Sequence, residues 1–225
     1  IVLSLERMDR IIVVDRANRL VVVEPGVFNA TLSHAVAEHG LFYPPDPSSW
    51  EFCSIGGNLS TNSGGLCCVK YGVTTDYVLG MEVVLASGEV LRTGRRTVKG
   101  VAGYDLTKLF VGSEGTLGVI TQATLSLRPT SQRPRTMAAL FPSTSAAAQA
   151  VAAIVAAGGV PSMLEIMDRT TLRAVNQWRD FGLPDEAAAM LIAQSDAGGE
   201  TAAAEIASIA EACRAAGAED VVEAA

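Results

Sequence analysis

Hydrophobic and polar positions divide the chain into two regions with different patterns. The first region holds short runs of Val, Ile and Leu, and residues 11–15 (IIVVD) and 20–24 (LVVVE) are the clearest of them. Such β-branched runs, separated by four residues, predict a hairpin of neighbouring strands. Residues 77–86 and 89–93 flank a Ser-Gly turn and predict a second hairpin. Residues 119–127 alternate in the way a half-buried strand does.

Three short helices are expected in the same region. Asn29 is placed to cap a helix over residues 30–39, which a glycine ends. Residues 55–61 predict a second helix, whose N-terminus would favour electron-rich groups of a ligand. Asp105 is placed to cap a third helix over residues 106–111.

The second region follows a linker with two prolines and three arginines at residues 128–135 and is rich in alanine. Strands are expected at 137–141, 163–167, 188–193 and 220–223. Helices are expected from Ser143 or Ser145 to 157, from Asp168 to 178, and over 202–215. Strands and helices that alternate in units this short predict an α+β sandwich of ferredoxin-like type.

The stretch from Pro44 to Gly65 is the richest in candidate chemistry. Its prolines stiffen the chain, its glycines admit close approach to bare backbone, and its Ser, Thr and Asn side chains offer uncharged hydrogen-bonding groups. This combination suits a bulky, flat, polar ligand. An ordinary surface loop is the alternative, since turn residues cluster in loops as well.

Composition narrows the class of protein. The chain has 225 residues, of which 49% are hydrophobic, and its net charge is −7, so we expect a packed globular protein and not disorder. An acidic chain without a basic stripe argues against nucleic acid and against an anionic membrane surface. We find no apolar run of the ~20 residues needed to span a membrane and no signal-peptide pattern, so we expect a cytoplasmic protein.

Two residue types bear on catalysis and metals. The four cysteines have no CxxC spacing, so reduced thiols are expected and no metal site. The histidines, His34 and His39, both fall on the helix predicted over 30–39, without Asp or Ser at triad-like spacing. We therefore assign no catalytic base.

Six blocks in order carry a family resemblance. They read PPDPSS, IGGN, TNSGG, KYGVTTDYVLGMEVVL, KGVAGYDLTKLFVGSEGTLGVIT and PSMLEIMDR. This order resembles the FAD-binding domain of the vanillyl-alcohol-oxidase or p-cresol methylhydroxylase (PCMH) type. It is most similar to the group that holds D-lactate dehydrogenase, D-2-hydroxyglutarate dehydrogenase and a subunit of glycolate oxidase. The resemblance implies an α+β chain: residues 1–130 as the second half of the FAD-binding domain, and 136–225 as the first part of a ferredoxin-like cap domain.

The resemblance also implies a cofactor and a reaction. A small D-2-hydroxy acid, such as glycolate or D-lactate, would lose a hydride from C2 to N5 of FAD. Glu114 is either a solvated loop acid or a hydrogen-bond acceptor that fixes its loop, and we favour the second interpretation. Ser48 and Asn62 would bond ring or phosphate oxygens. The expected cofactor-binding residues are Pro45, Asp46, Ser48, Gly56, Gly57, Asn62, Gly64, Gly65, Glu114, Gly115, Gly118, Ile120 and Thr121.

The chain departs from the family pattern at both ends. The family's pyrophosphate loop would precede Ile1, and its substrate-side region and histidine-rich metal motif would follow Ala225, so an internal piece of a longer enzyme is expected. Partners would be the hydroxy acid, an electron-accepting protein and a second copy of the chain.

Two other functions stay open: a non-catalytic interaction domain that does not retain FAD, and a flavin enzyme for another alcohol or for alkyl transfer. A nicotinamide-binding Rossmann enzyme is disfavoured, because residues 112–118 are spaced GxxGxxG and no GxGxxG follows a strand.

Overall fold

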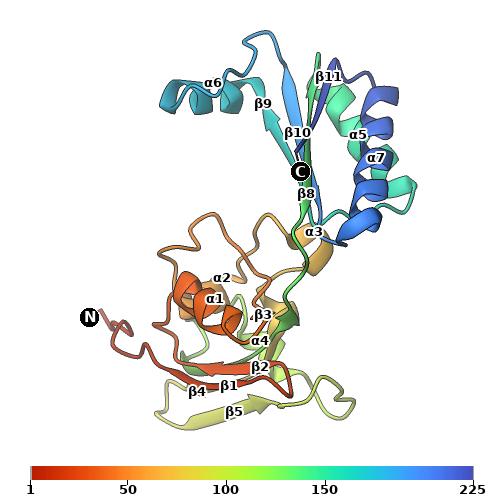
Figure 1. Cartoon of the computed structure of the whole chain (residues 1–225). Helices are drawn as coiled ribbons and strands as arrows, with labels where there is room; N and C mark the ends of the chain where they lie inside the picture. The colour runs from red at the N-terminus through yellow and green to blue at the C-terminus, as the bar shows by residue number, and fades with distance from the viewer. Residues whose placement is uncertain (1, 225) are drawn as a thin grey trace. The chain divides into compact units, whose positions relative to one another are not determined.

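The computed structural model describes residues 2–224, which form two compact units (Figure 1). Unit 1 comprises Ile1–Thr130 and unit 2 comprises Ser131–Ala225. Each unit has hydrophobic clusters of its own. We therefore describe the two units separately.

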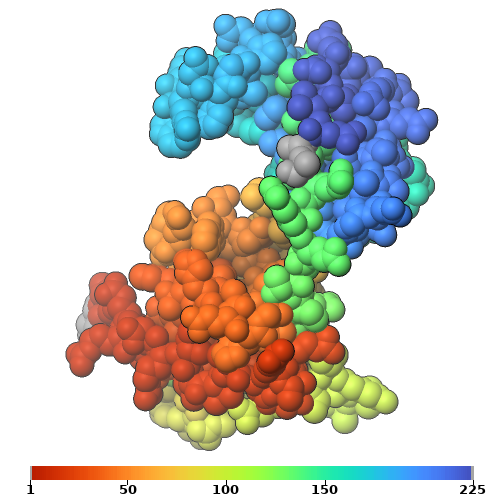
Figure 2. Space-filling view, viewed as in Figure 1, coloured from red at the N-terminus to blue at the C-terminus, as the bar shows by residue number. Residues whose placement is uncertain are grey.

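Unit 1 is built on a five-stranded antiparallel sheet in the order β1-β2-β6-β4-β5. Its strands are β1 (Ile11–Asp15), β2 (Leu20–Val23), β4 (Val78–Val84), β5 (Val90–Gly94) and β6 (Val119–Ser126). The strands expected from the hydrophobic pattern are all present. Figure 2 shows the yellow-green residues of β5 and of the loop after it along one edge of this unit.

The three predicted helices of unit 1 are also present. They are α1 (Asn29–Ala37), α2 (Ile55–Thr61) and α4 (Leu106–Phe110). Asp105 caps α4 as expected, because its side chain accepts a hydrogen bond from the Lys108 amide at 3.2 Å. Apolar side chains of α1 and α2, such as Leu32 and Leu59, pack in one core with those of β2 and β6.

The expected capping role of Asn29 is wrong. Asn29 is the first residue of α1, where its side chain is buried and its Nδ2 donates to the carbonyl oxygen of Pro45 at 3.0 Å. A buried amide needs a partner, and here the partner comes from a distant loop and not from the helix start. Local spacing could not reveal that contact.

Short elements escaped the sequence pattern. They are α3 (Cys68–Tyr71), the 3₁₀ helix η1 (Thr74–Tyr77) and the two-residue strands β3 (Leu41–Phe42) and β7 (Arg128–Pro129). The strand β7 pairs with β3 and the next strand begins at Arg135, so the predicted linker is wrong at its first two residues and at its last. Two residues carry no periodicity from which a strand could be inferred.

Unit 2 is a four-stranded antiparallel sheet in the order β11-β8-β10-β9. Its strands are β8 (Arg135–Phe141), β9 (Met163–Asp168), β10 (Ala189–Ser195) and β11 (Asp220–Ala224). Its helices are α5 (Thr144–Ala156), α6 (Arg169–Trp178) and α7 (Gly199–Ala215). The first and third strands lie in the centre, which is the ferredoxin-like order, and α6 is an addition between β9 and β10.

Side-chain caps explain where two helices of unit 2 begin, and apolar side chains on both faces of its sheet explain the packing of the helices. Ser143 accepts a hydrogen bond from the Ala146 amide at 3.1 Å and so starts α5, while Asp168 accepts one from Thr171 at 2.8 Å and starts α6. One face of the sheet, with Phe141, packs against α5 and α7. The other face packs against Leu172 of α6.

Candidate functional site

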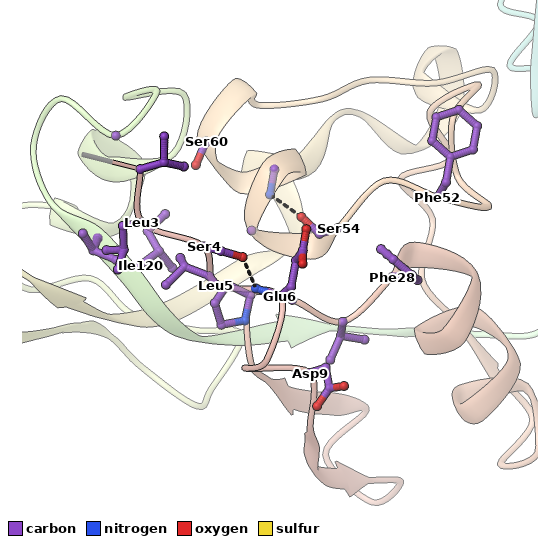
Figure 3. Close-up of a pocket in the computed structure, with 18 of the residues that line it drawn as sticks. Leu3, Ser4, Leu5, Glu6, Asp9, Phe28, Phe52, Ser54, Ser60 and Ile120 are labelled. Carbon is purple, nitrogen blue, oxygen red and sulfur yellow. Dashed lines mark hydrogen bonds between the residues drawn. The ribbon is translucent and has the colours of Figure 1, made fainter.

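A cleft of about 810 Å³ opens in unit 1 (Figure 3). Four segments line it: residues 2–6 together with Asp9, the turn at 25–28 between β2 and α1, the start of α2, and the segment 115–120 that leads into β6. Single residues of α1 and of the loop before α2 complete the lining. This volume lies in the range of small-molecule and cofactor pockets.

At the start of α2, backbone that no side chain covers faces the cleft. Ser54 has extended backbone and accepts a hydrogen bond from the Gly57 amide at 3.1 Å, which begins the helix at Ile55. Gly57 is exposed to the cleft, and a Cβ at this position would meet only the Ser54 Oγ, at 3.3 Å. A ligand can therefore lie directly on this backbone.

The glycines of the predicted site have two different reasons to be glycine. Gly57 and Gly115 line the cleft, and a Cβ on Gly115 would have no atom within 4 Å. A Cβ on Gly56 would lie 2.6 Å from the Pro25 Cβ, and one on Gly65 would overlap the Asp46 carbonyl oxygen. A Cβ on Gly118 would likewise lie 2.7 Å from a Val83 methyl. Close approach of a ligand therefore explains Gly57. Gly115 also has a φ of 75°, a left-handed conformation that favours glycine whatever lies beside it, and the other three glycines permit close packing of the chain on itself.

Main-chain hydrogen bonds hold the 112–120 segment against α2. The Gly112 amide donates to the Leu59 carbonyl at 2.8 Å, and the Glu114 amide donates to the Ser60 carbonyl at 2.9 Å. The Glu114 carboxylate is exposed and has no hydrogen-bond partner among residues 2–224. The expectation that this carboxylate fixes the loop is corrected: the backbone fixes it.

The structure brings part of the predicted site together in the cleft. Gly56, Gly57, Gly115, Gly118 and Ile120 line it. The remaining predicted residues lie outside the lining; they are Pro45, Asp46, Ser48, Asn62, Gly64, Gly65, Glu114 and Thr121.

Two polar residues outside the lining hold the fold locally. The Asp46 Oδ1 accepts a hydrogen bond from the Cys67 amide at 3.1 Å. Asn62 ends α2 in the left-handed conformation with φ of 49°, and its Oδ1 accepts from the Thr75 amide at 2.9 Å. The Asn62 oxygen thus accepts a bond from the protein, while its amide nitrogen could donate the expected bond to an oxygen of the ligand.

Two further members of the predicted set lie elsewhere in unit 1. Ser48 is an exposed loop residue. Thr121 lies on β6, where its hydroxyl donates to the Glu82 carboxylate of β4 at 2.9 Å. Neither residue lines the cleft.

Residues 2–6 with Asp9, and the turn at 25–28, are two parts of the cleft that sequence reasoning missed. Figure 3 shows Leu3, Ser4, Leu5, Glu6 and Asp9 along one side of it. These residues form no strand or helix and carry no motif. The signal that could have found them is the Pro-Gly pair directly after the second predicted strand.

The lining has a distinct electrostatic character. Its charged side chains among the described residues are the acids Glu6 and Asp9. The rest consists of hydroxyls such as Ser54, main-chain groups, and apolar side chains such as Phe28 and Ile120. This surface fits the flat ring and hydroxyl-bearing parts of FAD, and an anionic group would have to bind to backbone amides.

An ion pair anchors the segment that precedes β1. The Arg10 Nη2 lies 2.7 Å from one oxygen of Glu24, and the Arg10 Nε donates to the other at 3.1 Å. Glu24 follows β2 and is buried. The hydrogen bond from the Arg10 side chain, followed by that from its amide, lowers the pKa of Glu24 below its usual value.

This lowered pKa predicts a pH dependence of stability. Stabilisation by the Glu24 carboxylate is present above its unfolded pKa of about 4.3 and is lost as pH falls through the folded pKa. We expect Glu24→Gln to have a lower Tm than the wild type at neutral pH. The Tm gap should narrow below about pH 4. Thermal melts of both proteins across the acid range test this, and a gap that stays constant would contradict it.

The two histidines are not placed to act as a general base in the cleft. His34 packs edge-on against Trp50, with ring centroids 6.2 Å apart, and neither His34 nor His39 lines the cleft. Within the described residues, no group of three or more His, Cys, Asp or Glu could hold a metal ion. No helix in that range has the length and apolar character to cross a membrane.

Two protein families match the chain. The FAD binding domain matches residues 1–94, and the C-terminal domain of FAD linked oxidases matches residues 130–225.

Curated relatives are similar over much of the chain. Glycolate oxidase subunit GlcD of Bacillus subtilis is 46% identical over 214 residues, which cover 95% of this chain and 46% of that protein. Glycolate oxidase subunit GlcD of Escherichia coli K12 is 41% identical over 196 residues, which cover 87% of this chain and 39% of that protein. A D-lactate dehydrogenase of Archaeoglobus fulgidus is 41% identical over 169 residues, which cover 75% of this chain and 38% of that protein. The chain thus spans less than half the length of these relatives.

Solved structures share the fold. An alkyldihydroxyacetonephosphate synthase aligns with a TM-score of 0.82 at 22% identity, over 97% of this chain and 41% of that one. Substrate-bound p-cresol methylhydroxylase aligns with a TM-score of 0.79 at 18% identity, over 97% and 48%. With both domain families present in order, the chain belongs to the FAD-linked oxidases of the PCMH type, in the group of glycolate oxidase subunit GlcD and D-lactate dehydrogenase.

Proposed function

We propose that this chain forms one wall of the FAD site of an enzyme that oxidises a small D-2-hydroxy acid. The observation that carries the proposal is the cleft of unit 1, where bare backbone at Gly57 and Gly115 faces a space of cofactor size. Flat ligands need such faces, because any side chain there would hold the ring away from the backbone.

Residues of the chain would divide the work of holding FAD. Gly57 and Gly115 would let flat or ribityl parts lie on the backbone, and Ile120 would offer main-chain groups. Apolar Leu3 and Phe28 would shield the cofactor from water. When bound, FAD supplies the acceptor for the hydride that leaves C2 of the hydroxy acid. The predicted cofactor-binding residues that do not line the cleft would hold the lining residues in place.

The names of the relatives support a hydroxy acid as substrate. Proteins named glycolate oxidase subunit GlcD and D-lactate dehydrogenase match at 40% identity or more. Glycolate and D-lactate share a carboxylate beside an oxidisable carbinol carbon, so one of them is the proposed substrate. The word subunit in the former name supports a multi-subunit enzyme, in which a partner takes the electrons.

The test begins with FAD retention and continues with substrate. We expect the purified chain, after incubation with FAD and desalting, to keep the visible absorbance of oxidised flavin. In the longer enzyme that the resemblance implies, anaerobic addition of D-lactate or glycolate should bleach that band, while L-lactate serves as the control. A colourless protein would contradict the proposal and favour a non-catalytic interaction domain. A response to other alcohols alone would favour a different flavin oxidase.

A further inference from the structure

Irregular chain forms one side of the cleft. Residues 2–6 and Asp9 line it, yet residues 2–9 belong to no helix or strand. A segment without its own hydrogen-bonded element keeps its place only through contacts with the rest of the protein. Two such contacts hold it where the chain enters β1.

The first contact is a set of hydrogen bonds that Arg10 donates to the buried carboxylate of Glu24. Glu24 has a side chain only 7% exposed, and the guanidinium of Arg10 binds it through both oxygens. The Arg10 amide donates to the Glu24 Oε2 at 2.9 Å, and the Glu24 amide returns a bond to the Arg10 carbonyl at 3.0 Å. Bidentate charged pairs of this kind fix geometry as well as adding energy.

The second contact joins the backbone of Gly26 to the turn at residues 5–8. Its amide donates to the Met8 carbonyl at 2.7 Å. A Cβ on Gly26 would lie 2.7 Å from the Leu5 oxygen, 2.8 Å from the Met8 oxygen and 2.9 Å from the Glu6 oxygen. The turn at residues 5–8 therefore rests directly on the Gly26 backbone, and only glycine allows that approach.

We propose that Arg10, Glu24 and Gly26 form a latch that positions residues 2–9 as a wall of the cofactor cleft. Arg10 and Glu24 are positioning residues, because they do not line the cleft and set FAD affinity through the segment they hold, whereas Gly26 both supports that segment and lines the cleft. The inference rests on the proposed function, because it concerns the same FAD site.

A double-mutant cycle tests the latch. Arg10→Met and Glu24→Gln should each weaken FAD binding by about tenfold, the scale of hydrogen bonds to charged groups. The double variant should be no weaker than either single variant, because both changes open one latch. FAD affinity is measured by quenching of flavin fluorescence. Gly26→Ala should weaken FAD binding as well, since its methyl group would displace the turn.

Arg92→Met is the matched control. Arg92 pairs with Glu82 between neighbouring strands of the same unit but does not line the cleft. This variant should bind FAD as the wild type does. Visible circular dichroism of the bound flavin should change in the latch variants and not in the control, because it reports the surroundings of the ring and not global stability.

Hydrogen exchange separates failure of the latch from failure of the proposed function. In the FAD-free chain, the Arg10 and Gly26 amides should exchange faster in Glu24→Gln than in the wild type. Faster exchange with unchanged FAD affinity would overturn the proposal, as would multiplicative losses in the double variant. No FAD binding by the wild type would overturn the proposed function, and with it the cofactor role of the latch. Exchange would then still decide whether the latch anchors residues 2–9.

Discussion

Replacing Gly57 with valine should weaken FAD binding by about 10- to 100-fold while the protein stays folded. Gly57 is exposed on the wall of the cleft, and only the Ser54 hydroxyl lies near a Cβ placed there. A valine side chain would therefore occupy ligand space without meeting the core. Helix propensity predicts no loss of stability, because glycine is less favourable than valine inside a helix.

The control for this variant lies on the same helix. Thr61 is an exposed residue of α2 outside the cleft lining, so Thr61→Val places the same side chain away from the ligand. This change also removes the hydrogen bond that the Thr61 hydroxyl donates to the Gly57 carbonyl at 3.0 Å. Flavin fluorescence titration and thermal melts of both variants give the comparison. Full FAD retention by Gly57→Val, with an unchanged melt, would show that α2 is not a wall of the FAD site.

Replacing Phe141 with alanine should destabilise unit 2 by about 3–5 kcal/mol. Phe141 ends β8 with none of its surface exposed, and it is among the largest fully buried side chains. Its ring fills the core between the sheet and the two helices α5 and α7. A loss of this size is a large fraction of the stability of an ordinary domain, so unit 2 should be substantially unfolded at moderate urea concentrations.

Urea unfolding followed by hydrogen exchange would show where the loss falls. Amides of β10 should lose protection, whereas those of β2 should keep it, because Phe141 belongs to the core of unit 2 alone. Val222→Ala is the control, since Val222 is 58% exposed and its truncation should change stability by less than about 0.5 kcal/mol. A loss below about 1 kcal/mol for Phe141→Ala would contradict the expected tight packing.

Elements with a strong local signal were predictable from the sequence. The β-branched runs of β1 and β2 and the alternation in β6 specify strands through side-chain period alone. The caps Asp105, Ser143 and Asp168 were predictable because a capping side chain bonds a backbone amide three residues away. Asn29 fits the same rule, yet it contacts Pro45, since burial gave it a distant partner.

The candidate site was predictable only in part. Gly57 and Gly115 stand in recognisable blocks and face the cleft. Gly65 and Gly118 stand in the same kind of block, but protein atoms fill the space beside them. A glycine that admits a ligand and a glycine that admits another strand look alike in sequence.

The sequence alone determined the family, the two-region organisation and most strands and helices, because ordered motifs and side-chain periods are local properties of a chain. Only the tertiary structure decided which residues share the cleft. It brought the irregular residues 2–9 beside α2 and the 115–120 segment, and joined Arg10 to Glu24 across 14 positions. Such contacts depend on how distant segments pack, and no local pattern encodes that packing.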